Sequence, residues 1–370
     1  MKYYIIAGEA SGDLHASNMI AELKKLDSDA HFRCWGGDLM KTQGAELVKH
    51  YKDLAFMGFV EVLSNFRTII KNIRFCKQDI LSYKPDVVIL VDYPGFNLRI
   101  AEFAKQSGFK VVYYISPQVW AWKQARVQKI KQTVDKMFVI LPFEKEFYKK
   151  FDYDVDFVGH PLLDAIAQIT QKEISVIKDE LCLSEKPVIA LLPGSRKQEI
   201  SIMLPEMLKV INSFPGYQFA VAAVGTHGEE FYEIFCSEFP VKIITGLTYS
   251  LLMVSDAALV TSGTATLETA IFGVPEVVCY KGSYISYQLA RKLVKVDYIS
   301  LVNLVMQKEV VKELIQQEFN LNNLNNELKK ILNPDNREKM KIEYAKLREK
   351  LGGKGASENT AKRITEFLKH

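Results

Sequence analysis

The stretch Asp256-Ala-Ala-Leu-Val-Thr-Ser-Gly-Thr-Ala-Thr-Leu-Glu-Thr-Ala-Ile-Phe-Gly-Val-Pro-Glu-Val-Val278 decides the fold. Its pattern predicts a short apolar strand over 257–260, a turn of small residues, a short helix, and a second strand after the Gly-Val-Pro turn. Strands and helices alternate in the same way along both halves of the chain. This alternation predicts an α/β protein with two parallel-sheet domains that face one another.

The small-residue turn in this stretch is a candidate phosphate site. Backbone N–H groups at a helix N-terminus lack helical acceptors, and the helix dipole adds to their attraction for an anion. Glu268 follows one helical turn later, where its carboxylate could accept hydrogen bonds from a sugar diol. A capped helix with Glu268 as a solvated acid explains the stretch alone equally well. The candidate ligands are Ser262, Gly263, Thr264, Ala265, Thr266 and Glu268.

Size and composition limit the classes of protein to consider. The chain has 370 residues, which is enough for roughly two domains, and 48% of them are hydrophobic. A formal charge of +4, without a DNA-binding motif, does not favour a nucleic-acid partner. Five widely spaced cysteines indicate a reducing compartment and no zinc site. We expect no metal and no cofactor.

The N-terminus is predicted to be the first strand of the sheet. Its apolar run, residues 3–7, is too short for a signal peptide, and no stretch of about 18 apolar residues follows anywhere. We therefore expect a cytoplasmic protein whose membrane association, if any, is peripheral.

The first half contains two candidate ligand turns. After the strand at 3–7, Gly8-Glu-Ala-Ser-Gly-Asp13 leads into a helix; Gly8 and Gly12 would allow close backbone approach, and Ser11 or Asp13 would cap the helix. The motif is not GxGxxG, and a structural turn explains it well. A later apolar strand ends at Asp92, with Asn97 opening the next helix, and ligands bind at the carboxyl ends of strands in open α/β sheets. A turn carboxylate is the alternative for Asp92.

Aromatic residues and one histidine follow the next strands of this half. Trp120 and Trp122 lie after the strand at 111–115 and would either wall a sugar or acyl pocket or close the core. His160 follows a strand near 157 and is a candidate site residue. A histidine with only a structural role in the turn is an equal alternative.

The spacing of apolar residues over 59–77 predicts an amphipathic helix. Its basic residues are Arg67, Lys71, Arg74 and Lys77. The pattern alone favours a core-packed helix with a solvated basic face. The alternative is an apolar face open to lipid, with the basic residues at anionic head groups. The apolar positions that would face acyl chains are Phe59, Val62, Leu63, Phe66, Ile69 and Ile70.

The second half begins after a charged linker near 168–186. The strand from 188 leads to Gly194, Ser195 and Arg196, and arginine can bind a diphosphate with its planar donors. A surface arginine paired with Glu199 is the alternative. Farther on, Asn303 is expected in a short loop, and the chain from 308 is expected to be helical. We place the domains at 1–165 and 166–354, with a terminal helix in 355–370 that could cross back to the first domain.

Taken together, these stretches resemble the lipid-A-disaccharide synthase family over nearly the whole chain. The resemblance rests on the order and spacing of several motifs: Gly8-Glu-Ala-Ser-Gly-Asp13, Met57-Gly-Phe-Val-Glu-Val62, Ser116-Pro-Gln-Val-Trp-Ala-Trp122, Gly159-His-Pro161, Leu192-Pro-Gly-Ser-Arg196, Thr261-Ser-Gly-Thr-Ala-Thr-Leu-Glu268 and Ser300-Leu-Val-Asn303. It implies a GT-B fold of two Rossmann-like domains around a cleft and metal-independent inversion at the anomeric carbon. The implied donor is UDP-2,3-diacylglucosamine, and the acceptor is 2,3-diacylglucosamine 1-phosphate.

The resemblance also assigns roles to residues. Arg196 matches the family's essential arginine, Asn303 its late asparagine, and the turn up to Glu268 its UDP seat. Many members carry aspartate where this chain has Gly95, so we take Asp92 as the catalytic base instead. Because both substrates carry acyl chains, the resemblance favours the lipid-facing interpretation of 59–77, at the cytoplasmic face of the inner membrane. A homodimer is left open.

Two other functions remain compatible with the residues. One is an isomerase of the same architecture, similar to UDP-N-acetylglucosamine 2-epimerase, which has a soluble substrate and no need for the apolar basic helix. The other is a non-catalytic nucleotide-sugar binder that has lost its base, for which Gly95 is the argument.

Overall fold

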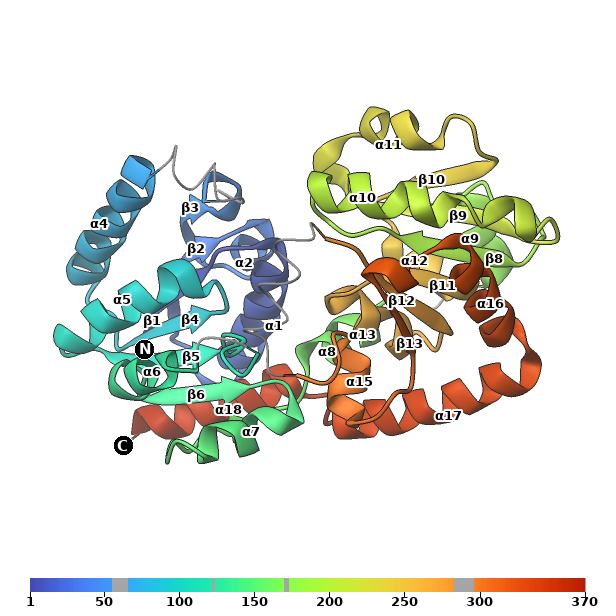
Figure 1. The fold of residues 1–370 in the computed structure, drawn as a ribbon. Helices are drawn as coiled ribbons and strands as arrows, with labels where there is room; N and C mark the ends of the chain where they lie inside the picture. Colours follow the sequence, from blue (N-terminus) through green and yellow to red (C-terminus); the bar gives the residue numbers. More distant parts are fainter. Residues whose placement is uncertain (55–65, 122–123, 170–172, 283–295, 370) are drawn as a thin grey trace. The chain divides into compact units, whose positions relative to one another are not determined.

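The computed structural model describes residues 1–54, 66–121, 124–169, 173–282 and 296–369, and the side chain of Phe66 is not described. These residues form two compact units (Figure 1). The first unit contains Met1–Ile169 and Leu351–His370, and the second contains Thr170–Lys350. The chain thus leaves the first unit once and returns to it for its last helix.

The first unit is a parallel sheet covered by helices. Its described strands lie in the order β3-β2-β1-β4-β5-β6-β7, and all pairs are parallel. The strands are β1 Lys2–Ala7, β2 His31–Gly36, β3 Glu46–His50, β4 Val87–Val91, β5 Lys110–Tyr114, β6 Lys136–Val139 and β7 Asp156–Phe157. The helices are α1 Ala10–Leu26, α2 Asp38–Thr42, α4 Phe66–Tyr83, α5 Pro94–Gln106, α6 Arg126–Thr133, α7 Pro142–Lys149, α8 Pro161–Ala167 and α18 Ala356–Lys369.

The terminal helix α18 packs against α1 and α8 of the first unit, and it is the red helix among the blue and green elements of Figure 1. Ala361 and Ile364 enter the core of this unit. Asp164 accepts hydrogen bonds from the backbone N–H groups of Gly355 (2.6 Å) and Ser357 (2.8 Å), which fixes the start of α18.

The second unit repeats the architecture with six described strands in the order β10-β9-β8-β11-β12-β13, all parallel. The strands are β8 Val188–Leu192, β9 Gln218–Ala223, β10 Val241–Thr245, β11 Ser255–Thr261, β12 Glu276–Tyr280 and β13 Lys312–Ile315. The helices are α9 Ile174–Glu180, α10 Lys197–Leu208, α11 Glu229–Cys236, α12 Thr248–Met253, α13 Thr264–Ile271, α15 Leu301–Met306, α16 Leu321–Leu332 and α17 Pro334–Lys350.

The buried strands explain why both sheets are parallel. All five residues of β4 and of β8 are buried, as expected for strands covered by helices on both faces. In each sheet the strand order reverses at one place, between β1 and β4 and between β8 and β11. Open α/β sheets bind ligands outside the carboxyl ends of the strands at such a switch point. The topology therefore predicts that each unit binds its ligand at the carboxyl ends of its strands, beside the switch point.

Two sequence-based predictions about this second unit are wrong. Asn303 lies in helix α15 and not in a loop, because Ser300 caps that helix by accepting a hydrogen bond from the backbone N–H of Asn303. The chain after residue 308 is not purely helical, because the short strand β13 extends the sheet beside β12. The strand β3 in the first unit was also not predicted.

Candidate functional site

At the switch point of the first unit, the turn after β1 lies against the turn after β4. A Cβ atom added at Gly8 would lie 2.3 Å from the ring of Tyr93, so only glycine allows this approach. The pairing of Ala7 with Val91 brings the ends of the two strands together. Gly8 and Asp92, both candidates from the sequence, are therefore neighbours in the structure.

The backbone at Asp92 is strained. Asp92 (φ 46°) and Tyr93 (φ 50°) are consecutive non-glycine residues in the left-handed region, which costs on the order of 1–3 kcal/mol for each. The buried amide of Asn97 donates to three carbonyl oxygens, those of Ile6 (3.3 Å), Val91 (3.2 Å) and Asp92 (2.7 Å). Surrounding groups thus hold a conformation that the two residues would not adopt alone.

The carboxyl group of Asp92 has an altered acidity. Burial, and then the nearby Glu9 carboxylate, raise its pKa to about 7, and a hydrogen bond from the Tyr93 backbone opposes the shift. A carboxylate with a pKa near neutrality is suited to general-base catalysis. At Gly95, an added Cβ atom would meet nothing within 4 Å.

The remaining candidates in the α1 region have different surroundings. Ser11 is exposed in the first turn of α1, and Gly12 packs close to Ala7. Asp13 is buried, and its carboxylate accepts hydrogen bonds from the backbone N–H groups of Gly37 (2.8 Å), Leu39 (3.1 Å) and Met40 (3.2 Å). Asp13 therefore caps α2, and the structure uses its oxygens within the fold.

His160 is buried at the start of α8. Its Nδ1 accepts a hydrogen bond from the Leu162 N–H (3.3 Å), which identifies it as the helix cap. Burial, and then the proximity of His15, lower its pKa to about 3, so His160 is neutral at physiological pH. His15 was not a candidate from the sequence; burial lowers its pKa to about 4 against the opposing effect of Asp164.

Trp120 is buried, with its ring edge-to-face on Phe143 at a centroid distance of 4.9 Å, and so contributes to the core. Trp122 lies outside the described residues. Of the six acyl-facing candidates, Phe59, Val62 and Leu63 lie outside the described residues, and Phe66 is described only as the first residue of α4. Ile69 and Ile70 are half-buried on α4.

The outer surface of α4 is basic. Arg67, Lys71 and Arg74 are exposed at helical spacing on α4, and Phe75 and Leu81 are exposed to 45% and 48%. The opposite side of the helix contributes buried residues, including Cys76 and Ile80. The described part of α4 therefore has one face packed against the protein and one face exposed to solvent.

In the second unit, the turn after β8 presents the exposed cation Arg196. Glu199 accepts a hydrogen bond from the Ser195 N–H (3.0 Å), and a Cβ atom at Gly194 (φ 106°) would collide with the Glu199 carboxylate. Glu199 is thus committed to the turn. Arg196 is exposed and forms no ion pair with any residue of the described ranges. His227, which the sequence did not single out, binds the Ser195 carbonyl through Nε2 at 2.8 Å.

The turn after β11 lies on the other side of the switch point from the turn after β8. Gly263 and Thr264 are exposed at the start of α13, where the first N–H groups of a helix have no helical acceptor. The hydroxyl of Thr266 donates to the Gly263 carbonyl (2.8 Å), and Ala265 is half-buried. The Ser262 hydroxyl donates to the Ile299 carbonyl (2.8 Å), and the Ser262 N–H donates to the Cys279 carbonyl (3.1 Å). Among the described residues, the first amides of α13 are therefore the groups of this turn that suit an anion.

Glu268 is half-buried in α13. Tyr249 of α12 donates a hydrogen bond to its Oε1 (2.8 Å). Burial raises the pKa of Glu268, and the bond from Tyr249 opposes this shift. Tyr249 was missed in the sequence because only the fold brings α12 beside α13. The bond to Tyr249 gives the carboxylate one orientation, with its second oxygen not used by that bond.

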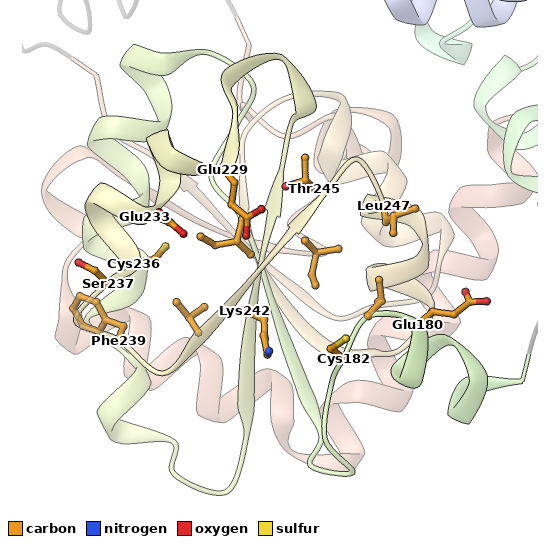
Figure 2. A pocket seen from close by; sticks show the side chains of 14 residues that line it. Glu180, Cys182, Glu229, Glu233, Cys236, Ser237, Phe239, Lys242, Thr245 and Leu247 are labelled. Carbon is orange, nitrogen blue, oxygen red and sulfur yellow. The ribbon is translucent and has the colours of Figure 1, made fainter.

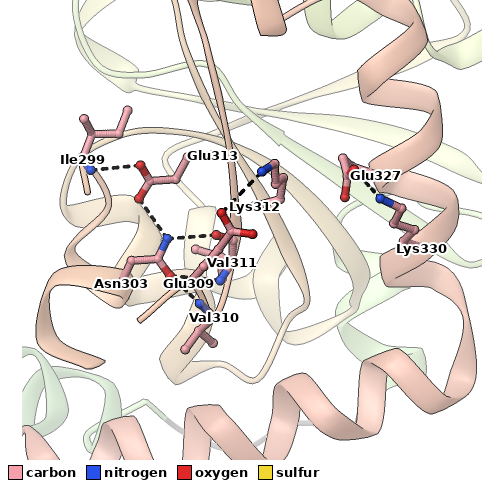
Figure 3. Close-up of polar contacts among 9 residues, drawn as sticks. All are labelled: Ile299, Asn303, Glu309, Val310, Val311, Lys312, Glu313, Glu327 and Lys330. Carbon is pink, nitrogen blue, oxygen red and sulfur yellow. Dashed lines mark hydrogen bonds and ion pairs between the residues drawn. The ribbon is translucent and has the colours of Figure 1, made fainter. Parts of the chain in front are cut away.

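Asn303 is completely buried, and the fold uses both ends of its amide (Figure 3). Its Nδ2 donates to Glu313 Oε1 and to the Val311 carbonyl, both at 2.9 Å, and its Oδ1 accepts from the N–H groups of Val310 (2.7 Å) and Val311 (3.0 Å). Glu313 also accepts from the Ile299 N–H (3.0 Å). Through Ile299, this network supports the turn that contains Ser262.

One hollow lies away from all these candidates. It has a volume of about 660 Å³ and lies along the edge strand β10 (Figure 2), with Lys242 between Glu229 and Glu233 on one side and Glu180 and Leu247 on the other. In the described ranges, no cluster of three His, Cys, Asp or Glu side chains is arranged to hold a metal ion. No helix in the described part of the chain is long and apolar enough to cross a membrane.

Two parallel α/β units, each with polar turns at its switch point, define a protein of the GT-B class. Solved structures of this class resemble the chain in fold. The UDP-GlcNAc 2-epimerase from Neisseria meningitidis bound to UDP-GlcNAc has a TM-score of 0.65 at 14% identity, and 100% of both chains is covered. The calicheamicin glycosyltransferase CalG4 has a TM-score of 0.60 at 15% identity, with 100% of this chain and 98% of the other covered.

The family follows from sequence similarity. A family model described as lipid-A-disaccharide synthetase matches residues 3–367. The lipid-A-disaccharide synthase of Syntrophus aciditrophicus is 42% identical, with 99% of this chain and 97% of the relative covered. That of Geobacter metallireducens is 40% identical, with 98% and 96% covered. The chain belongs to the lipid-A-disaccharide synthase family and is a glycosyltransferase. The resemblance stated from the motifs is confirmed, and neither the isomerase nor the non-catalytic binder is favoured.

Proposed function

We propose that the protein transfers a 2,3-diacylglucosamine unit from UDP to 2,3-diacylglucosamine 1-phosphate, with inversion, and releases lipid A disaccharide 1-phosphate and UDP. Family membership supports the substrates. The observation that carries the mechanism is the carboxyl group of Asp92, which is held at the switch point of the first unit with a pKa of about 7.

In the proposed reaction, Asp92 removes the proton from the attacking hydroxyl of the acceptor. The hydroxyl oxygen forms a bond to the anomeric carbon while the bond from that carbon to the UDP oxygen breaks. A single displacement of this kind inverts the anomeric centre. The rate increase that a positioned base supplies is about 10²–10⁴-fold.

The second unit supplies the groups for the leaving diphosphate. Arg196 has no ion-pair partner within the described residues, so its guanidinium is available to phosphate oxygens. The amides at the start of α13, together with the Gly194 backbone and the exposed side chain of Ser195, would bind the same group. The second carboxylate oxygen of Glu268 would accept hydrogen bonds from the ribose. Charge on the departing UDP is then stabilised by protein groups.

Other candidates have supporting roles in this proposal. Asn303 orders the turn around Ser262 through Glu313 and Ile299 and does not itself contact substrate. Asp13 and His160 shape the acceptor side as helix caps, because the carboxylate of Asp13 and Nδ1 of His160 accept hydrogen bonds from backbone N–H groups. Ser11 and Gly12 remain proposed acceptor contacts.

We further propose that α4 places the enzyme peripherally on the cytoplasmic face of the inner membrane. The exposed basic residues Arg67, Lys71 and Arg74 would meet anionic head groups, and the exposed Phe75 would contact the interface. A homodimer remains a prediction, and light scattering of the purified protein tests it.

The function is tested by incubating the full chain with both acylated substrates and measuring UDP and disaccharide. The proposal predicts equal amounts of the two products. UDP-sugar binding without any product would support a non-catalytic binder, and an epimerised sugar would support an isomerase; either result contradicts the proposal.

A further inference from the structure

The backbone of Asp92 takes part in three hydrogen bonds. Its N–H donates to the Tyr114 carbonyl (3.0 Å), and its carbonyl accepts from Asn97 Nδ2 (2.7 Å) and from the Tyr113 hydroxyl (2.6 Å). Tyr113 belongs to β5, the strand that pairs with β4, and no candidate role was assigned to it from the sequence. Two donors on different elements thus converge on one oxygen.

These hydrogen bonds matter because the backbone at Asp92 and Tyr93 is strained. The left-handed conformations of Asp92 and Tyr93 persist only where surrounding groups over-determine them. Tyr113 is completely buried, so the packing around its ring confines the hydroxyl that donates to the Asp92 carbonyl. A rotation of the Asp92 peptide would also redirect the Asp92 carboxylate, because both depend on the same backbone torsions.

We infer that Tyr113 is a positioning residue for the transfer, whose hydroxyl fixes the strained Asp92 peptide and thereby aims the carboxylate at the acceptor hydroxyl. The inference rests on the proposed function of Asp92. Tyr113 donates to the backbone and not to the carboxylate, and its contribution is therefore geometric. An error of about 1 Å in the position of a reacting group can cost about 10²-fold in rate.

The test compares Tyr113→Phe with a matched control, Tyr153→Phe. Tyr153 is also a buried tyrosine of the first unit, and its hydroxyl donates to the Val134 carbonyl (3.1 Å). Each change removes one hydrogen bond from a tyrosine to a carbonyl, so both variants should lose similar thermal stability. For Tyr113→Phe we expect kcat to fall about 10- to 100-fold with KM for both substrates within about twofold, whereas Tyr153→Phe keeps kcat within about twofold.

A third variant, Asp92→Asn, separates the two claims. If Asp92→Asn is inactive and Tyr113→Phe turns over like its control, the positioning role is overturned and the base remains. If Asp92→Asn retains near wild-type kcat, the proposed base fails, and the inference for Tyr113 fails with it. A rise in KM in proportion to the fall in kcat for Tyr113→Phe would also overturn the inference, because it would indicate a disturbed binding site.

Discussion

Replacing Asp92 with asparagine should lower the activity strongly and stabilise the protein. The pKa of Asp92 is raised from 3.8 to about 7, so the folded state holds a proton that the unfolded state loses above pH 4. Stability is then lost as the pH rises from about 4 to about 7. At about 1.36 kcal/mol per pKa unit, the limit is about 4 kcal/mol. Because Asp92 is only half-buried, solvent screening lowers this limit, and we expect about 1–3 kcal/mol.

The assay is thermal unfolding of Asp92→Asn and wild type between pH 4 and pH 8.5. The variant's advantage in Tm should grow between pH 4 and 7 and then level off at about 3–8 °C. Asp86→Asn is the matched control, because Asp86 precedes the same strand at its other end and is exposed. An advantage that does not grow with pH, or an equal gain for Asp86→Asn, would refute the burial of an ionisable group at the switch point.

Three further predictions concern other parts of the chain. Asn303→Ala should destabilise the second unit by about 2–4 kcal/mol and weaken UDP binding, because the buried partners of Asn303 lose their hydrogen bonds. Urea unfolding measures the first effect and calorimetric titration with UDP the second. Unchanged UDP affinity would contradict the proposed support of the Ser262 turn. Glu276→Gln should raise Tm at pH 7.5 and not at pH 4, because burial raises the pKa of this completely buried carboxyl; a lower Tm at pH 7.5 would contradict this. Lys71→Glu should weaken binding to anionic liposomes about tenfold, whereas the exposed control Lys149→Glu should not, and equal losses would indicate a non-specific charge effect.

The sequence predicted the parts of this protein that depend on local pattern. Apolar runs that end in small polar turns correctly predicted the central strands, and the positions of Gly8 and Asp92 at strand ends correctly indicated their place in the sheet. Strand β3 was missed, because none of its residues is fully buried at this edge of the sheet and its apolar pattern is weak. Strand β13 was missed because it is short and lies between charged helices.

The side-chain partners could not be predicted, because they come from distant parts of the chain. Tyr249 meets Glu268 only after α12 and α13 have packed, and Glu313 meets Asn303 only after β13 has joined the sheet. The prediction that Ser11 or Asp13 caps the first helix is wrong, because no side chain of the described residues caps α1. The carboxylate of Asp13 instead caps α2, a helix that begins 25 residues later at Asp38. Residue types and strand ends indicate candidate site residues. The fold then determines which of these side chains keep polar atoms that are available to a ligand.

The central claim is that Asp92 acts as the base and Arg196 holds the departing UDP. The most direct test is disaccharide formation by the full-length Asp92→Asn and Arg196→Ala variants with both acylated substrates. We predict that Asp92→Asn lowers kcat by about 10²–10⁴-fold and that Arg196→Ala lowers it by about 10²–10³-fold. Near-normal rates in both variants would contradict the account.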